Sequence, residues 1–185
     1  QNFTDIWLLD FTSIDEDLYL HFLSPDELKK ADKFHFIKDR QAYTICRGVL
    51  RKLLSSYVGI TPSNIEFTYN EYGKPEISNE TKINFNVSHS GDYGLLAFSS
   101  LWQLGVDLEK IKSIEYMSLA ESVFSDEEFL SLRDFSSNDI ADAFFCGWTR
   151  KESFIKAIGM GLSYPLSDFC VSLDPNEDIS KVKIS

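Results

Sequence analysis

The chain has 185 residues, of which 43% are hydrophobic and 14% aromatic, and its formal net charge is −11. This composition supports at least one sizeable core and excludes a disordered chain, while the negative charge excludes a surface that binds nucleic acid or acidic lipid as a whole. No apolar run has the length of a membrane span, and the first residues do not resemble a signal peptide, so we expect a cytoplasmic protein. Cys46, Cys146 and Cys170 have no metal-ligand spacing, and we expect buried thiols.

The first elements in chain order are a short strand and two helices. Trp7–Leu9 has the composition of a strand. Ser24, followed by proline and then by glutamate at the third helical position, predicts the start of a helix that extends to about Phe34. From Lys38 to Tyr57 the apolar residues recur at helical spacing, and Gly59 follows as a stop signal.

The segment from Leu28 to Lys52 is basic, although the chain is acidic. Eight lysines and arginines stand there against two aspartates, so this segment carries +6 and the rest of the chain −17. Arg40, Arg47 and Arg51 fall on one side of the second helix, within about 40° of one another. The pattern favours an anion site for a phosphorylated molecule or an acidic partner, but a solvated helix face has the same composition.

Strand-like segments follow, and the last two of them are expected to pair as a hairpin: Ile65–Tyr69, Ile83–Val87, Tyr93–Phe98 and Gln103–Leu108. A small polar loop is expected around Ser88 and His89, before Gly91. Its hydroxyl, imidazole and backbone N–H groups suit a phosphate, although such residues are also ordinary turn formers.

The pattern then becomes helical again. A helix is expected at Tyr116–Val123, a second one is capped by Ser125 with Glu128 at its third position, and a long helix runs over 139–158 and ends at Gly159. The element order predicts an α+β chain of two parts that meet near residues 110–114.

Two groups of residues carry candidate chemistry. Asp107 and Glu109 are two positions apart on a predicted strand, so their carboxylates share a face and suit a hard divalent cation such as Mg²⁺. On the long helix, Trp148, Glu152 and Lys156 share a face. Taken singly, the first group also fits an exposed strand face, and the second fits a plain helical ion pair.

These segments together resemble the Sfp-type 4′-phosphopantetheinyl transferase family, from about Ser24 to Val171. The family marks are a G-[IV]-D-x-E strand, a W-x-x-K-E-[AS]-x-x-K helix, an F-N-x-S-H loop and an upstream G-K-P turn. They stand here in the family's order, at Gly105–Glu109, Trp148–Lys156, Phe85–His89 and Gly73–Pro75.

The resemblance implies a set of site residues. The metal ligands for Mg²⁺ would be Asp107, Glu109 and Glu152. Binding of coenzyme A would fall to Arg40, Arg47, Lys74, Pro75, Ser88, His89 and Lys156, with Arg47 on the ribose 3′-phosphate. Glu152, Lys156 and His89 would be catalytic, and the proton of the attacking serine would pass to Glu152, to a magnesium-bound water or to His89. Glu128 stands at a position where the family often has an acidic residue.

The resemblance also implies the fold and the reaction. The fold would be a pseudo-dimer of two similar halves, here residues 1–110 and 111–185, with the active site at their interface. The reaction would move 4′-phosphopantetheine from coenzyme A to a serine of an acyl or peptidyl carrier protein and release adenosine 3′,5′-bisphosphate. We expect a monomer without nucleic-acid or membrane partners, with the carrier docking near Met160–Pro165.

Three points stay open at this level. Family members usually continue for several more strands, and the sequence does not say whether the natural chain continues past Ser185. The sequence does not say which carrier or pathway is served, or whether acylated coenzyme A is accepted. The alternatives are another Mg²⁺-dependent enzyme of phosphoryl or nucleotidyl transfer, which would act without a carrier, and a non-catalytic module that binds coenzyme A or an acidic peptide.

Overall fold

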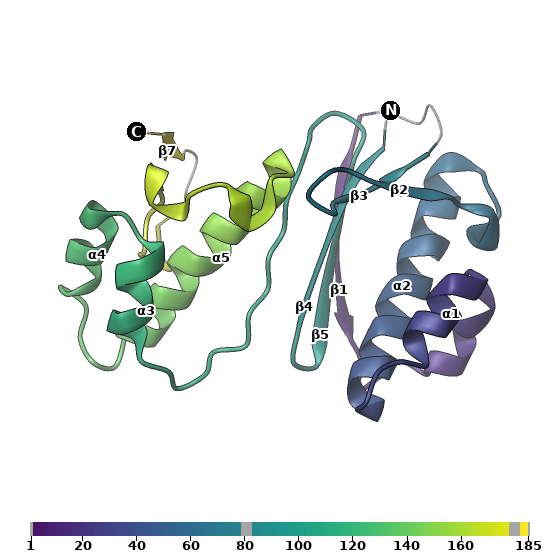
Figure 1. Cartoon of the computed structure of the whole chain (residues 1–185), viewed down its shortest axis with the longest axis horizontal. Coiled ribbons are helices and arrows are strands. Elements are labelled where there is room, and N and C mark those ends of the chain that lie inside the picture. Colours follow the sequence, from purple (N-terminus) through teal and green to yellow (C-terminus); the bar gives the residue numbers. More distant parts are fainter. Residues whose placement is uncertain (1, 79–82, 178–181, 185) are drawn as a thin grey trace.

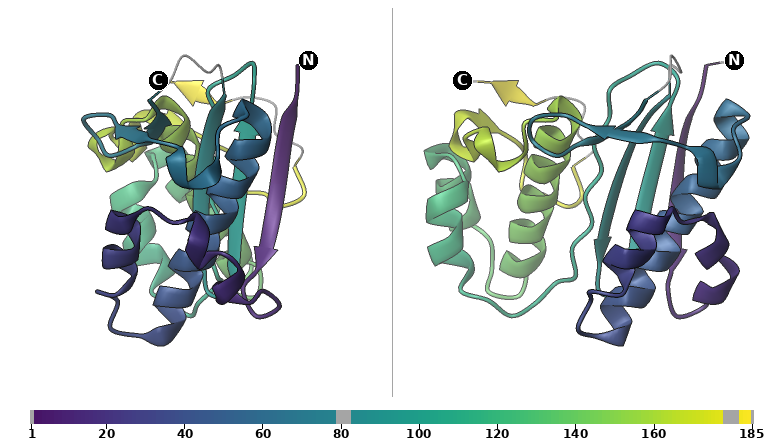
Figure 2. Two further views of the ribbon diagram at one scale, coloured as in Figure 1. Left: turned by 90° about the vertical axis from the view of Figure 1, so that its right-hand side faces the viewer. Right: turned by 45° about the vertical axis from the view of Figure 1, so that its right-hand side comes forward.

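The computed structural model describes residues 2–78, 83–177 and 182–184. Figure 1 shows two bodies with an extended segment running between them, and Figure 2 gives two further views. The first body consists of β1 Thr4–Asp10, η1 Glu16–Leu18, η2 Leu20–Phe22, α1 Pro25–Ala31, α2 Ile37–Val58, η3 Pro62–Asn64, β2 Phe67–Tyr69, β3 Pro75–Ile77, β4 Asn84–Ser90 and β5 Tyr93–Ser99. The second consists of α3 Tyr116–Val123, α4 Asp126–Leu132, α5 Ile140–Ile158, η4 Gly161–Ser163, η5 Leu166–Asp168, β6 Phe169–Cys170 and β7 Lys183–Ile184. The chain is therefore α+β, as its predicted elements indicated.

The core of the first body lies between α2 and one face of an antiparallel sheet. The strand order is β1-β5-β4, and β2 pairs with β3 in a separate ribbon. Phe85 and Phe98 lie opposite each other on β4 and β5, are 3% and 0% exposed, and pack in one cluster with Ile45 and Leu50 of α2. Because side chains alternate along a strand, the other face of β4 is left to polar residues.

The predicted helix boundaries are confirmed except at the end of the first helix. Ser24 caps α1 through a capping box, but α1 ends at Ala31 instead of Phe34. The helices α2 and α5 end at Gly59 and Gly159, which have φ angles of 72° and 77°. Glycine suits both positions because a side chain disfavours this left-handed conformation.

Two predictions about strands are wrong. The partner of β5 is β4 and not residues 103–108, which form no strand. The predicted loop at Ser88 and His89 is part of β4, which continues to Ser90 and pairs there with Tyr93. The chain reverses in the two residues after Ser90, where Gly91 has a φ of 61°, so the polar residues before it remain in the ladder. The strand expected from Ile65 begins at Phe67.

The second body packs its elements around α5. One cluster contains Phe124 and Phe144, and another contains Ile155 and Phe169, both of which are fully buried. Among the cysteines only Cys46 is buried as predicted, since the other two are half-buried, and all three are free. In the part of the chain that the structure describes, no helix is long and apolar enough to cross a membrane.

Candidate active site

The extended segment that joins the two bodies is held by side chains of β4 and not by its backbone. The N–H groups of Val106, Leu108 and Lys110 donate to Asn86 Oδ1 at 2.9 Å, Ser88 Oγ at 3.3 Å and Ser90 Oγ at 3.0 Å. These acceptors are alternate residues of β4, so they project from its polar face in step with alternate residues of the segment. This arrangement explains why a sequence with strand-like alternation does not join the sheet.

The same serines bind the two carboxylates of the segment. Ser88 Oγ donates to Asp107 Oδ1 at 2.8 Å, and Ser90 Oγ donates to Glu109 Oε2 at 2.9 Å. Lys156 Nζ reaches Asp107 Oδ1 at 2.5 Å and Ser88 Oγ at 3.1 Å. The side chain of Asp107 is 4% exposed. Residues from β4, from the connecting segment and from α5 therefore meet at one carboxylate.

Gly105 is what brings the connecting segment onto α5. A Cβ atom at this position would lie 2.0 Å from the carbonyl oxygen of Ser153 and 2.4 Å from the backbone nitrogen of Ala157. These are backbone atoms of a helix, which do not move aside as a flexible side chain does. Sequence reasoning noted this glycine only as part of a motif, and its role lies in this contact.

The three predicted metal ligands lie within electrostatic reach of one another. Burial raises the pKa of Glu152 above its ordinary value of 4.5; the charge of Lys156 lowers this pKa, and the carboxylates of Asp107 and Glu109 raise it. Mutual repulsion of this kind is relieved when a divalent cation lies between carboxylates.

The donor set suits Mg²⁺, although the side chains do not form a closed site as they are placed. Among the described residues, no three Asp, Glu, His or Cys side chains lie close enough to hold one metal ion. Asp107 Oδ2, however, is buried and has no hydrogen-bond partner in the described parts of the chain. A buried carboxylate oxygen without a donor favours a cation. We conclude that Asp107, Glu109 and Glu152 fit a hard divalent ion by their chemistry.

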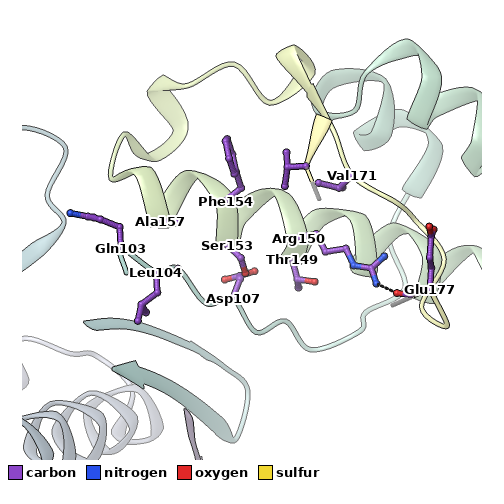
Figure 3. A pocket seen from close by; sticks show the side chains of 12 residues that line it. Gln103, Leu104, Asp107, Thr149, Arg150, Ser153, Phe154, Ala157, Val171 and Glu177 are labelled. Atoms are coloured by element: carbon purple, nitrogen blue, oxygen red, sulfur yellow. Dashed lines mark hydrogen bonds between the residues drawn. The ribbon is translucent and has the colours of Figure 1, made fainter. Parts of the chain in front are cut away.

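A cavity of about 590 Å³ adjoins this carboxylate. Figure 3 shows the side chains that line it, which come from α5, from the connecting segment and from the segment that follows α5, with Asp107 next to Ser153. Phe154 and Leu104 give the wall an apolar part, while Asp107 supplies a carboxylate.

Lys74 and its turn contact the C-terminal end of α5. Lys74 Nζ donates to the carbonyl of Ala157 at 2.8 Å, and Asn70 Nδ2 donates to the carbonyl of Gly159 at 2.8 Å. Burial lowers the pKa of Lys74. Pro75 is the first residue of β3. The G-K-P turn thus lies against the helix that carries Glu152, a contact that sequence reasoning did not foresee.

His89 is not brought together with the carboxylates. It stands between Ser88 and Ser90 on β4, so its side chain projects from the opposite face of the strand, where it is exposed. Its predicted role in catalysis and phosphate binding stays a prediction.

The three arginines of the basic helix α2 lie in two different surroundings. Arg40 Nη2 lies 3.4 Å from Glu16 Oε1, whereas Arg47 and Arg51 line a separate cavity of about 920 Å³ formed by α1, α2 and β2. This volume lies in the range of small-molecule pockets, about 300–1,000 Å³. The guanidinium of Arg47 stacks at 3.9 Å from the ring of Phe67.

One buried glutamate organises this cavity, and sequence reasoning treated it only as a helix cap. Glu27 Oε2 accepts from the N–H of Ser24 at 2.8 Å and from Arg51 Nε at 2.6 Å, while Oε1 accepts from Arg47 Nε. Arg51 also donates through Nη1 to the carbonyl of Pro62, the first residue of η3, and to that of Ile65, the residue after it.

The second body contains the same arrangement. Glu128 Oε2 accepts from the N–H of Ser125 at 2.8 Å and pairs with Lys151 Nζ at 2.7 Å. Lys151 also donates to the carbonyl of Leu166, the first residue of η5, and to that of Phe169, the residue after it. In each body, therefore, a capping-box glutamate holds a cation of the long helix, and that cation holds a short 3-10 turn. Glu128, expected as an acidic family position, and Lys151, which sequence reasoning passed over, are structural.

Comparisons with known proteins match both parts of the chain to one family. A family model described as "4'-phosphopantetheinyl transferase, N-terminal" matches residues 12–101, and one described as "4'-phosphopantetheinyl transferase superfamily" matches residues 103–183. The chain is 36% identical over 159 residues to the 4'-phosphopantetheinyl transferase HetI of Nostoc sp. strain PCC 7120, covering 84% of this chain and 67% of HetI. It is 34% identical over 166 residues to the 4'-phosphopantetheinyl transferase Sfp of Bacillus subtilis, covering 90% of this chain and 73% of Sfp.

A human relative is similar over almost the whole chain. The L-aminoadipate-semialdehyde dehydrogenase-phosphopantetheinyl transferase of Homo sapiens is 33% identical over 189 residues, covering 95% of this chain and 58% of that protein. The chain thus spans about two thirds to three quarters of HetI and Sfp and a smaller part of the human protein. The chain belongs to the Sfp-type 4′-phosphopantetheinyl transferase family.

Proposed function

We propose that the chain carries out the reaction of its family, moving 4′-phosphopantetheine from coenzyme A to a serine of a carrier protein. Adenosine 3′,5′-bisphosphate is the other product. The observation that carries this proposal is the meeting of Asp107, Ser88 and Lys156 beside Glu152, at the place where the two bodies join. In family terms the two bodies would be the similar halves of a pseudo-dimer, and the shared glutamate-cation arrangement supports that reading.

Asp107, Glu109 and Glu152 would hold Mg²⁺ in this proposal. When bound, the ion would neutralise charge on the diphosphate of coenzyme A. The two serines of β4 position the first two carboxylates through the 2.8 Å and 2.9 Å hydrogen bonds described above. Their contribution is preorganisation, since carboxylates held before the ligand arrives need not rearrange during the reaction.

The position of Lys156 supports a role for its ammonium group in binding the diphosphate. Its ammonium lies against Asp107 and remains 26% exposed, so it is open to an anion that approaches the carboxylate. A cation there offsets the negative charge that develops on the leaving adenosine bisphosphate. Lys74, from the turn that contacts α5, would add a second positive charge. The proton of the carrier serine needs an acceptor, and Glu152 is the acceptor we propose, since the charges of Lys156 and Asp107 act on its carboxylate.

The cavity around Arg47 would receive the nucleotide end of coenzyme A. Lys30, Tyr43 and Tyr69 line it together with Arg47, and Lys30 Nζ lies 5.2 Å from the centre of the Tyr43 ring. Aromatic rings and cations are the groups that bind an adenine ring and a phosphate. Arg40 does not line this cavity, and its predicted part in binding stays a prediction.

The carrier protein would dock beyond the end of α5. Leu162 in η4 is 71% exposed, whereas Tyr164 packs against Phe154 and Phe169. The segment Met160–Pro165 therefore presents an exposed leucine next to an anchored tyrosine, which suits a hydrophobic contact with an acidic carrier. We propose a monomer that acts on one carrier at a time.

The deciding experiment is mass spectrometry of an apo carrier protein incubated with this protein, coenzyme A and Mg²⁺. We expect the phosphopantetheine mass increment on the carrier serine. Asp107→Asn and Glu152→Gln are expected to lower the rate by roughly 10²- to 10³-fold, as does the loss of one preorganised electrostatic group, with an unchanged circular dichroism spectrum. Leu162→Asp is expected to raise KM for the carrier and leave KM for coenzyme A unchanged.

Each competing function has its own outcome in the same assay. Cleavage of coenzyme A without any carrier would point to another enzyme of phosphoryl transfer. Binding of coenzyme A without transfer to any carrier would point to a binding module. Near wild-type labelling by Asp107→Asn or Glu152→Gln would show that the proposed metal ligands are wrong.

A further inference from the structure

The two capping-box glutamates differ in the partner of their second carboxylate oxygen. In the second body, Glu128 Oε1 accepts from the backbone N–H of Val171 at 2.7 Å, a contact that only ties two elements together. In the first body, the corresponding oxygen of Glu27 accepts from the side chain of Arg47. Arg47 lies four residues before Arg51, the cation of the first body. The corresponding position in the second body, four residues before Lys151, is Gly147, which lies close to the side chains of Leu173 and Phe124. Only the first body therefore has a second cation at this position.

Glu27 and Tyr69 determine which edge of the Arg47 guanidinium is free. The Nε atom faces Glu27, and Nη2 donates to the hydroxyl of Tyr69 at 3.2 Å. The ring of Phe67 lies 3.9 Å from the centre of the guanidinium and sets its plane. No partner of Nη1 occurs among residues 2–78, 83–177 and 182–184. The arginine is thus held on three sides and keeps donors for an anion in the cavity.

The chemistry of the ligand identifies that anion. Coenzyme A carries a diphosphate and one further phosphate, on the ribose 3′-oxygen. In the proposed function the diphosphate reacts at Asp107 and Lys156, and neither of these residues lines the cavity of Arg47. The 3′-phosphate is the remaining anion. Exposed carboxylates of Asp26 and Glu66 also line this cavity, so an arginine with a fixed orientation matters more there than general positive charge.

We propose that Glu27 is a positioning residue for the 3′-phosphate of coenzyme A: it holds Arg47 through Nε and directs the remaining donors into the cavity. The inference rests on the proposed function. Glu27 is 8% exposed and does not need to touch the ligand. Burial raises the pKa of Glu27, but the hydrogen bonds from Arg51, Ser24 and Arg47 and the charge of Arg47 together hold this pKa below its ordinary value, so the group is a carboxylate at neutral pH.

The test compares kcat/KM for coenzyme A with kcat/KM for 3′-dephospho-coenzyme A on one apo carrier. Wild-type protein is expected to prefer coenzyme A. Glu27→Gln is expected to lower this preference about tenfold or more, the range expected when a charged hydrogen bond is lost. The folded fraction of each preparation cancels in the ratio, so a loss of stability alone does not move it. Arg47→Gln is expected to lower the ratio as far, and Glu27→Gln to add nothing in the Arg47→Gln background.

Glu128→Gln is the matched control, because it disturbs the corresponding capping box without touching the cavity. It is expected to leave the ratio unchanged. If Glu27→Gln yields no folded protein, Glu27→Asp keeps the charge beside Arg51 and is expected to lower the ratio by a smaller factor. An unchanged ratio in the folded Glu27 variant, or equal falls in the Glu27 and Glu128 variants, overturns the inference.

Failure of the inference differs from failure of the proposed function. If wild-type protein labels the carrier but does not prefer coenzyme A to its 3′-dephospho form, the inference alone is wrong. If wild-type protein labels no carrier from either substrate, the proposed function is wrong, and the inference falls with it.

Discussion

The long helices α2 and α5 carry the same supporting arrangement and put it to different uses. In both bodies a capping-box glutamate holds a cation that reaches over to a short 3-10 turn. In α5 this cation, Lys151, is completely buried, and the next residue, Glu152, belongs to the candidate active site. In α2 the matching Arg51 is joined by Arg47 at the wall of a cavity. The difference teaches that one supporting arrangement can serve two kinds of candidate site. In α5 the residue next to the buried cation is a carboxylate, Glu152, whereas in α2 the residue one turn before the cation is a second arginine, Arg47.

The largest expected effect is on stability, at the pair formed by Lys151 and Glu128. Lys151→Met leaves a carboxylate that is 2% exposed without its cation, which is expected to lower the free energy of unfolding by about 3–5 kcal/mol. Arg47→Met leaves Glu27 with Arg51 and is expected to cost only about 1–2 kcal/mol. Urea unfolding measures both. Equal losses in the two variants would show that the two arrangements are energetically alike and would break the comparison.

The next largest effects concern two glycines, one expected to affect catalysis and the other stability. Gly105→Ala is expected to push the connecting segment away from α5 and to lower kcat about 10²-fold, because displacements of about 1 Å have that effect on preorganised groups. Gly147→Ala meets Leu173 Cδ2 at 2.3 Å, a side-chain atom that can shift, and is expected to cost about 1–3 kcal/mol of stability. Its kcat per folded molecule should match wild type. A normal kcat for Gly105→Ala would show that the backbone contact with α5 is dispensable.

The smallest expected effect is on the pH dependence of stability, through Glu27 in the first body. The pKa of Glu27 is lower in the folded protein than its ordinary value of 4.5, so the unfolded chain binds the proton more readily. The stability that Glu27 contributes is therefore present above pH 4.5 and is lost as the pH falls through the lowered pKa. Unfolding curves for wild type and Glu27→Gln, measured from about pH 6 to about pH 3, are expected to converge at the acid end. A stability difference that stays constant over this range would contradict the assignment.

Local signals predicted the elements that depend on neighbouring residues. The two capping boxes, the long helices and their glycine ends follow from residues within a few positions of one another, and the structure confirms them. The motif at Gly105–Glu109 was found for the same reason, since its spacing is local. Its conformation was not predicted, because strand-like alternation does not reveal that Asn86, Ser88 and Ser90 would take the place of a backbone partner.

By itself, the sequence determined the helices, the family and a candidate set of polar site residues, because these are properties of composition and short-range spacing. Only the tertiary structure decided which of those residues meet. Lys156 reaches Asp107 across 49 positions, Lys74 reaches α5 across 83, and Arg47 turns to Glu27 across 20, while Arg40 on the same helix turns elsewhere. Such contacts depend on how helices and strands pack around two cores, and that packing is decided by buried surface over the whole chain rather than by neighbours in sequence.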